Sequence, residues 1–110
     1  MNDKEKLGVM NQMRLLFMRG QRAKDVFTSA IATQKGKLGG KRYICKKCIK
    51  VFPQKDVQVD HIVPIVSPGF HKINIGLDTY AHRVFCEERN LQVLCKPCHH
   101  KKTLKENAKR

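Results

Sequence analysis

Hydrophobic residues recur at helical spacing in the first third of the chain. Met10, Met13 and Phe17 are three or four residues apart within a mainly polar stretch that runs from Lys4 to Arg19. This spacing predicts an amphipathic helix. Its candidate boundary signals are Asn2 or Asp3 as the N-cap and Gly20 as the stop.

A second helix with a more regular pattern is predicted over residues 21–33. Apolar residues follow the i, i+3, i+4, i+7, i+8 pattern at Ala23, Val26, Phe27, Ala30 and Ile31. We expect the two helices to form a hairpin whose apolar faces pack against the rest of the chain. A DNA-contacting or dimerising face is the alternative use of the same pattern.

The middle of the chain changes to the period of a strand. Val57 and Val59 alternate with polar neighbours, as in a half-buried strand, and Pro64 limits its length. A second strand is predicted over residues 91–94, which are mainly apolar. Between them, helical spacing returns at Leu77, Tyr80, Ala81, Val84 and Phe85, with Asp78 as a candidate N-cap.

The last segment is predicted to be a basic helix. Pro97 suits its first turn, because the amide hydrogen that proline lacks has no helical partner there. Helices and a few strands together predict an α+β fold. We divide the chain into an N-terminal helical extension, residues 1–40, which ends in a basic glycine-rich connector, and a compact module, residues 41–110. The connector glycines are Gly36, Gly39 and Gly40, and either phosphate contact or a solvated loop explains them.

Two CxxC turns stand far apart in the sequence, Cys45 with Cys48 and Cys95 with Cys98. Two such turns are a common way to give one zinc ion four thiolate ligands, so we expect a structural zinc site. A disulfide framework and a thioredoxin-like redox pair are the competing interpretations. The odd fifth cysteine, Cys86, argues against the first and is interpreted as a buried core thiol, and two pairs would be superfluous for the second.

The formal net charge of +14 over 110 residues points to a polyanionic partner, most simply a nucleic acid. The charged N-terminus and the short apolar run at residues 15–18 do not resemble a signal peptide or a membrane span. We therefore expect no membrane association and a cytoplasmic location. A reducing cytoplasm also favours metal over disulfides at the CxxC turns.

Three segments resemble a known family, and they are Asp60-His61-Ile62-Val63-Pro64, Asn90-Leu91-Gln92-Val93-Leu94-Cys95, and Cys98-His99 with Lys102-Thr103. Their order and their cysteine frame resemble the signature of HNH endonucleases in its zinc-braced, phage-type form. The resemblance covers about half of the chain and leaves the first 40 residues outside it.

The resemblance implies a ββα-metal fold that hydrolyses DNA phosphodiesters with one catalytic divalent ion. Asp60 and His99 would be its metal ligands and His61 the general base. Asn90 would belong to the catalytic motif as the brace of the hairpin loop. A carboxylate and an imidazole suit Mg²⁺ or Mn²⁺ and also admit Ni²⁺ or Co²⁺. Free-standing members of this kind are similar to phage enzymes encoded near packaging genes, so a packaging partner is an expectation too.

The residues near this motif leave the third metal ligand and the DNA contacts undecided. Thr103 stands where many members of the family have a third metal ligand, and His100 is the nearest histidine that might replace it. Surface or structural roles are expected for His71 and His82. Lys101, Lys102 and Lys105 are candidate DNA-phosphate contacts, although a solvated helix face has the same pattern. The competing function classes are a non-catalytic zinc-knuckle module that binds nucleic acid and an RNA-binding zinc ribbon.

Overall fold

The structure is a computed structural model, and it describes residues 1–32 and 40–108. Within these residues it has four α-helices and two antiparallel two-stranded sheets, which confirms the α+β class. The elements in chain order are α1 Asp3–Arg19, α2 Gln21–Ser29, β1 Arg42–Ile44, β2 Val51–Pro53, β3 Val57–His61, α3 Leu77–Val84, β4 Leu91–Cys95 and α4 Lys96–Ala108.

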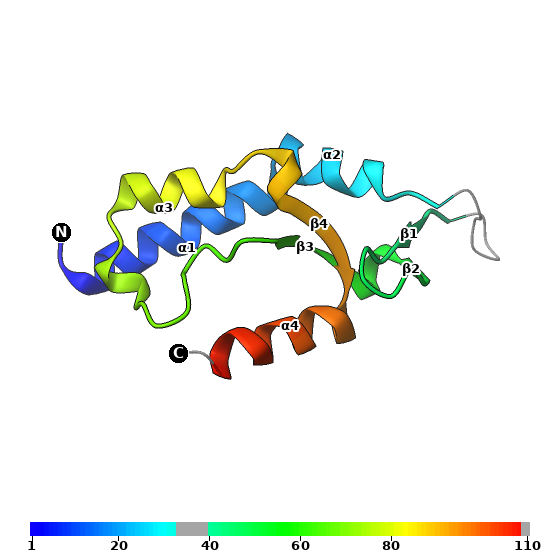
Figure 1. Ribbon diagram of the computed structural model, residues 1–110. Coiled ribbons are helices and arrows are strands. Elements are labelled where there is room, and N and C mark those ends of the chain that lie inside the picture. The colour runs from blue at the N-terminus through cyan, green and yellow to red at the C-terminus, as the bar shows by residue number, and fades with distance from the viewer. Residues whose placement is uncertain (33–39, 109–110) are drawn as a thin grey trace.

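Helix α1 has the boundaries that its sequence signals predict. Asn2 is the N-cap, and its side chain accepts a hydrogen bond from the Glu5 amide while the Glu5 carboxylate accepts one from the Asn2 amide. This capping box satisfies two amides that the first turn leaves unpaired. Gly20 then separates α1 from α2, and α2 continues away from the end of α1 in Figure 1 and does not fold back along it, so the predicted helical hairpin is wrong.

Helix α2 ends at Ser29, earlier than the predicted end at Thr33, and Thr33 itself lies outside the described residues. The apolar spacing continues past Ser29, but Ile31 forms an antiparallel bridge with Tyr43, and the Ala32 amide donates to the Arg42 carbonyl. Pairing with β1 therefore prevails over helical periodicity. Of the predicted glycine connector, Gly36 and Gly39 also lie outside the described residues.

The sheet formed by β3 and β4 lies at the centre of the molecule. Strands β3 and β4 pair in antiparallel register from Val57 opposite Cys95 to His61 opposite Leu91. The long segment between them carries α3, the helix that the apolar spacing predicts, and Phe85 is its C-cap. Gly76 is its N-cap, and no side chain caps it. Asp78, the predicted cap, lies in the first helical turn instead.

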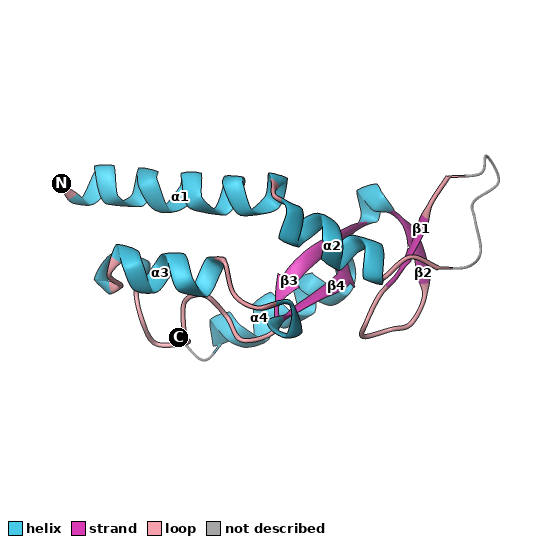
Figure 2. Ribbon diagram, turned by 90° about the horizontal axis from the view of Figure 1, so that it is seen from above, coloured by secondary structure: helices cyan, strands magenta, loops and turns pink. Residues whose placement is uncertain are grey.

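The helices cover both faces of the β3–β4 pair. In Figure 1, α4 lies on one side of these strands, and α1, α2 and α3 lie on the other. Figure 2 shows α1 and α3 side by side, with the small β1–β2 hairpin at the far end of the molecule. Helix α4 begins at Lys96 directly after β4, so Pro97 stands in its first turn as predicted.

One hydrophobic cluster joins the N-terminal helices to the strands. It includes Met10, Phe17 and Val26 from the helices together with Val59 and Val93 from the β3–β4 pair. Met10 is completely buried, and Phe17 is 2% exposed. The N-terminal extension is therefore packed into the same core as the remainder of the described chain.

Replacing Met10 by alanine should test this packing. Met10→Ala leaves a cavity in a closely packed core, and the free energy of unfolding should fall by about 2–5 kcal/mol. Leu16→Ala is the matched control, because Leu16 belongs to the same helix but is exposed, and its change should stay within about 0.5 kcal/mol. Denaturant unfolding of the zinc-loaded proteins measures both. An equal, small effect of the two substitutions would contradict a shared core.

Candidate functional site

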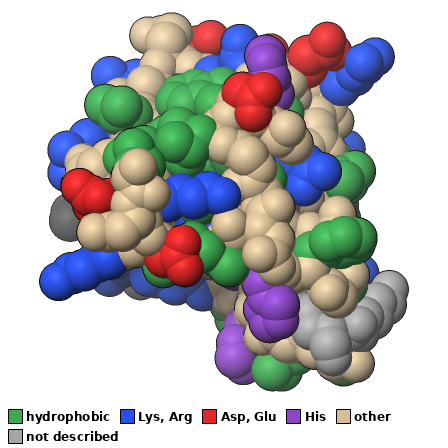
Figure 3. All heavy atoms as spheres, turned by 90° about the vertical axis from the view of Figure 1, so that its left-hand side faces the viewer, with side chains coloured by type: hydrophobic (Ala, Val, Ile, Leu, Met, Phe, Trp, Pro, Cys, Tyr) green, Lys and Arg blue, Asp and Glu red, His purple; other side chains and the backbone are tan. Residues whose placement is uncertain are grey.

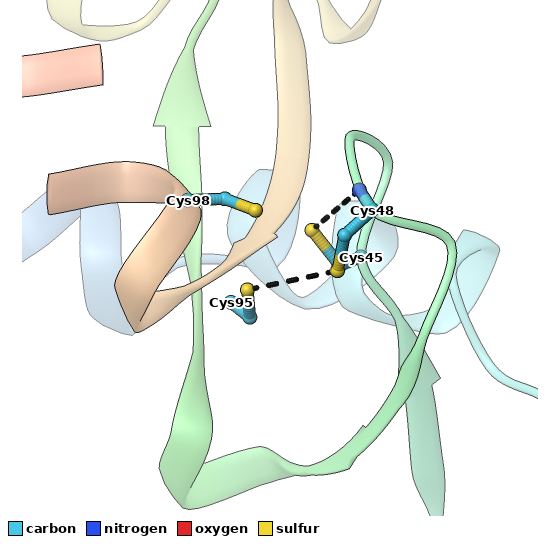
Figure 4. Close-up of side chains that lie close together, drawn as sticks. All are labelled: Cys45, Cys48, Cys95 and Cys98. Atoms are coloured by element: carbon cyan, nitrogen blue, oxygen red, sulfur yellow. Dashed lines mark hydrogen bonds between the residues drawn. The ribbon is translucent and has the colours of Figure 1, made fainter. Parts of the chain in front are cut away.

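The four cysteines of the two CxxC turns come together. Their Sγ atoms all lie within 4.8 Å of one another, and Figure 4 shows the side chains converging from the knuckle loop and from the junction of β4 with α4. The Sγ atoms of Cys48 and Cys95 are 3.9 Å apart. Tetrahedral zinc with Zn–S bonds of about 2.3 Å requires sulfurs about 3.8 Å apart, so donor type and spacing both fit zinc.

Backbone hydrogen bonds shape the first knuckle and attach it to the second sheet. The Ile49 amide donates to the Cys45 carbonyl, and the Cys48 amide donates to the Cys45 Sγ at 3.5 Å. Ile49 has a positive φ of 62°, which reverses the chain toward β2. The Lys46 amide donates to the Val93 carbonyl at 2.9 Å, so the knuckle is anchored to β4 before any metal is considered.

The electrostatics of the cluster favour a bound cation. Burial would raise the pKa of Cys45, but hydrogen bonds from the Cys48, Cys95 and Lys47 amides lower it to about 6. In contrast, the pKa of Cys98 is raised to about 12, mainly by the neighbouring Cys95 side chain. One thiolate therefore forms readily, whereas further thiolates need a positive charge among them. A divalent metal ion supplies that charge.

A second cluster lies in a cleft of about 290 Å³ between β3, α4 and the loop after β3. Asp60, His61 and His99, which the family resemblance groups together, all line this cleft. Asp60 is 6% exposed, and its Oδ1 lies 3.5 Å from the Nε2 of His99. The structure thus brings the three residues into one place.

Asp60 and His61 are adjacent in β3, and different elements hold them. The side-chain Nε2 of Gln92 donates to Asp60 Oδ2 at 2.9 Å, which leaves Oδ1 directed toward His99. The Nε2 of His61 makes a 2.8 Å hydrogen bond to the Val84 carbonyl, and its ring packs on Phe17 with 5.0 Å between ring centroids. Since a carbonyl can only accept, Nε2 carries the hydrogen and Nδ1 keeps the basic lone pair.

The surroundings of His61 favour its neutral form. Burial lowers the pKa of His61, and the positive charges of Arg14 and Lys102 lower it further. The Val84 carbonyl and the Asp60 carboxylate act in the opposite direction without reversing the shift. A neutral imidazole near pH 7 can accept a proton.

Asn90 holds the loop that leaves β3 and does not line the cleft. Its Oδ1 accepts from the Val63 amide at 2.9 Å, and its carbonyl accepts from the Ile62 amide at 2.8 Å. Its Nδ2 faces the Cys86 sulfur at 3.5 Å. Cys86 is partly buried and packs against the hydrophobic core, so the predicted buried core thiol is confirmed in its place and only in part in its burial.

The three lysines grouped in the sequence analysis have different surroundings. Lys102 belongs to the cleft, where its Nζ lies 3.3 Å from Asp60 Oδ2 and 3.0 Å from the His61 carbonyl, and it also pairs with Glu106. Lys101 and Lys105 are exposed and line a separate groove of about 710 Å³ beside α4, together with Lys47.

Two charged residues of the cleft were missed by the sequence analysis. Glu106 follows His99 by seven residues, two helical turns, and this spacing was the available signal. Arg14 enters from α1, and no local pattern could have indicated it. Thr103, where the resemblance led us to expect a third metal ligand, also lines the cleft. The other three histidines, His71, His82 and His100, are absent from its lining in the described part of the chain.

No family model, curated protein or solved structure matches this chain. None of the helices in residues 1–32 and 40–108 is long and apolar enough to cross a membrane.

Substituting one cysteine should separate the zinc ligands from the remaining thiol. Cys95→Ser removes a buried ligand, so the purified protein should lose its zinc and much of its folded structure, because zinc contributes on the order of 10 kcal/mol to the folding of small zinc modules. Cys86→Ser, the control, should keep about one zinc ion per chain. Elemental analysis and circular dichroism measure the two effects. Equal zinc content in both variants would exclude the four-cysteine site.

Proposed function

We propose that this chain is a metal-dependent DNA endonuclease of the HNH class. The observation that carries the proposal is the convergence of Asp60, His61 and His99 in one cleft, with the His61 tautomer fixed by the Val84 carbonyl. The chain order of β3, β4 and α4, an antiparallel pair followed by a helix, agrees with the ββα-metal arrangement that the resemblance implies.

Asp60 and His99 are suited to bind one catalytic divalent ion. Two ligands of an octahedral ion with bonds of about 2.1 Å lie about 3 Å apart, and the 3.5 Å between Asp60 Oδ1 and His99 Nε2 is close to this. Mg²⁺ or Mn²⁺ suits the carboxylate, and Ni²⁺ or Co²⁺ is compatible with the imidazole. When bound, the ion would polarise the phosphate and stabilise the leaving 3′ oxygen.

His61 acts in this proposal as the general base. Its Nδ1 takes a proton from the attacking water while Nε2 stays hydrogen-bonded to the Val84 carbonyl. Phe17 against the ring limits its rotation, so the lone pair keeps one direction. Asn90 contributes indirectly, because it fixes the backbone that follows His61.

The path of the DNA is proposed to follow the groove beside α4. Its four lysines are Lys47, Lys101, Lys102 and Lys105, and it contains no acidic side chain among the described residues. Lys102 lines both this groove and the cleft, so a strand lying in the groove would lead to Asp60. The end of the molecule seen in Figure 3 differs, because basic side chains there alternate with acidic, histidine and hydrophobic ones.

The second candidate is a nucleic-acid-binding zinc module without catalysis. The zinc cluster and the lysine groove would serve either function, for DNA or for RNA. A binder, however, has no need for a buried carboxylate facing an imidazole, nor for a histidine held in one tautomer. A phage origin and a packaging partner remain expectations from the resemblance.

A plasmid-nicking assay should decide between the two functions. Zinc-loaded wild type should nick supercoiled plasmid with Mg²⁺ or Mn²⁺, and His61→Ala should be slower by about 10²–10⁴-fold because the general base is lost. His100→Ala is the matched control, since His100 is exposed on α4 outside the cleft, and it should cut at the wild-type rate. Folded wild type that binds DNA but does not nick with Mg²⁺, Mn²⁺, Ni²⁺ or Co²⁺ would refute the proposal.

The lysine groove makes a separate prediction about binding. The slope of log K against log salt should fall by about 1 for each of Lys101→Ala and Lys105→Ala, because each contact releases about one counterion. Lys24→Ala should leave the slope unchanged, since Lys24 lies in α2 on the other side of β4. Fluorescence titrations of a short duplex at several salt concentrations measure the slopes. A uniform decrease for all three variants would argue against a defined groove.

A further inference from the structure

Arg14 brings a positive charge from the N-terminal helix to the candidate catalytic cleft. It is an exposed residue of α1 that lines the cleft together with Asp60, His61 and His99. Helix α1 lies outside the segments that resemble the HNH family, so the resemblance assigns Arg14 no role.

The packing of α1 fixes where Arg14 lies. Phe17 follows it by three residues, on the same side of the helix, and is 2% exposed. The Phe17 ring contacts both the His61 ring and, edge to face at 5.9 Å, the Phe85 ring. Met10, which precedes Arg14 by one helical turn, is completely buried. These two anchors hold the intervening turn of α1 over the cleft.

Arg14 and Lys102 differ in their charge partners. Lys102 is paired with Asp60 and Glu106, and its Nζ also donates to the His61 carbonyl. Arg14 forms no ion pair with any carboxylate of the described residues. It lies beside the buried Tyr80 hydroxyl, where its positive charge opposes the rise that burial causes in the pKa of this phenol. The charge of Arg14 is thus available to an anion that enters the cleft.

We propose, on the basis of the proposed nuclease function, that Arg14 binds a non-bridging oxygen of the scissile phosphodiester and stabilises its transition state. A guanidinium presents paired N–H donors that match two phosphate oxygens, which an ammonium does not. As the bond from water oxygen to phosphorus forms and the bond from phosphorus to the 3′ oxygen breaks, negative charge grows on the non-bridging oxygens. The water proton passes to His61 Nδ1, and the 3′ oxygen takes a proton from solvent.

The proposal makes the N-terminal extension one wall of the active site. Phe17 from this helix restrains the base and Arg14 meets the substrate, so one element supplies two functions. A fixed donor is worth most where charge develops, since it needs no reorganisation during the reaction. Loss of Arg14 should consequently lower kcat more than it raises KM.

The test compares Arg14→Ala, Arg14→Lys and the control Arg19→Ala, all zinc-loaded and full-length. Arg19 is exposed at the end of the same helix and does not line the cleft. Two substrates are used with Mn²⁺, supercoiled plasmid and bis(4-nitrophenyl) phosphate, which offers a phosphodiester and no further backbone. Arg14→Ala should lower kcat by about 10- to 100-fold on both substrates, Arg14→Lys should recover part of the loss, and Arg19→Ala should match wild type.

Other outcomes overturn the inference in distinguishable ways. If Arg14→Ala slows plasmid cleavage but leaves the small diester unaffected, Arg14 contacts a distant phosphate and not the scissile one. Equal rates for Arg14→Ala and Arg19→Ala exclude any substrate contact. A fall in the free energy of unfolding or in zinc content that accounts for the lost activity would assign Arg14 a structural role.

Failure of the nuclease proposal itself has a different signature. Wild type and His61→Ala would then both be inactive on both substrates, and the transition-state role of Arg14 would fail with the proposed function. The phosphate contact would still be decided by the Arg14 Nε–Hε NMR signal, identified by its loss in Arg14→Lys, during titration with a short DNA duplex. A duplex-induced shift would support the contact, and an unchanged signal would exclude it.

Discussion

The candidate site depends on the four cysteine sulfurs, which reinforce the attachment of the first knuckle to β4 that the hydrogen bond from the Lys46 amide to the Val93 carbonyl provides. One pair comes from the knuckle between β1 and β2, and the other comes from the corner where β4 turns into α4. Without a cation, successive thiolates would repel one another. A bound metal ion such as zinc would fix the direction in which α4 leaves β4. His99 follows Cys98 directly, so the cysteine cluster would then also fix where this imidazole lies relative to Asp60.

The β3 strand places two neighbouring residues in different environments at one end of the sheet. Asp60 is held by Gln92 of β4 and by Lys102 of α4, whereas His61 is held by the Val84 carbonyl of α3 and by Phe17 of α1. Successive side chains of a strand point to opposite faces. The cleft includes both residues because β3 ends at His61. The chain turns away there, and Asn90 holds the turn by accepting a hydrogen bond from the Val63 amide.

The sequence predicted what depends on local chemistry. Helical spacing located α1 and α3, because this signal acts between residues a few positions apart. Each CxxC turn is also a local signal, and the meeting of the two distant turns was expected because one metal ion takes four thiolates. The end of α2 was missed because Ile31 pairs with Tyr43, a residue of another element. The presence of Arg14 in the cleft was missed for the same reason, since it depends on packing between α1 and the β3–β4 pair.

The pairing of Lys102 explains how Asp60 can be buried and still serve as a metal ligand. A carboxylate that is 6% exposed needs a positive partner, and Lys102 provides one at 3.3 Å on Oδ2. Oδ1 points instead toward His99, so the neutralising lysine and the proposed metal use different oxygens. Glu106 and the His61 carbonyl also hold the ammonium. Lys102 can therefore remain bound if Asp60 also binds the proposed divalent ion, and Arg14 is left as the cleft cation without a carboxylate partner among the described residues, as the proposed phosphate contact requires.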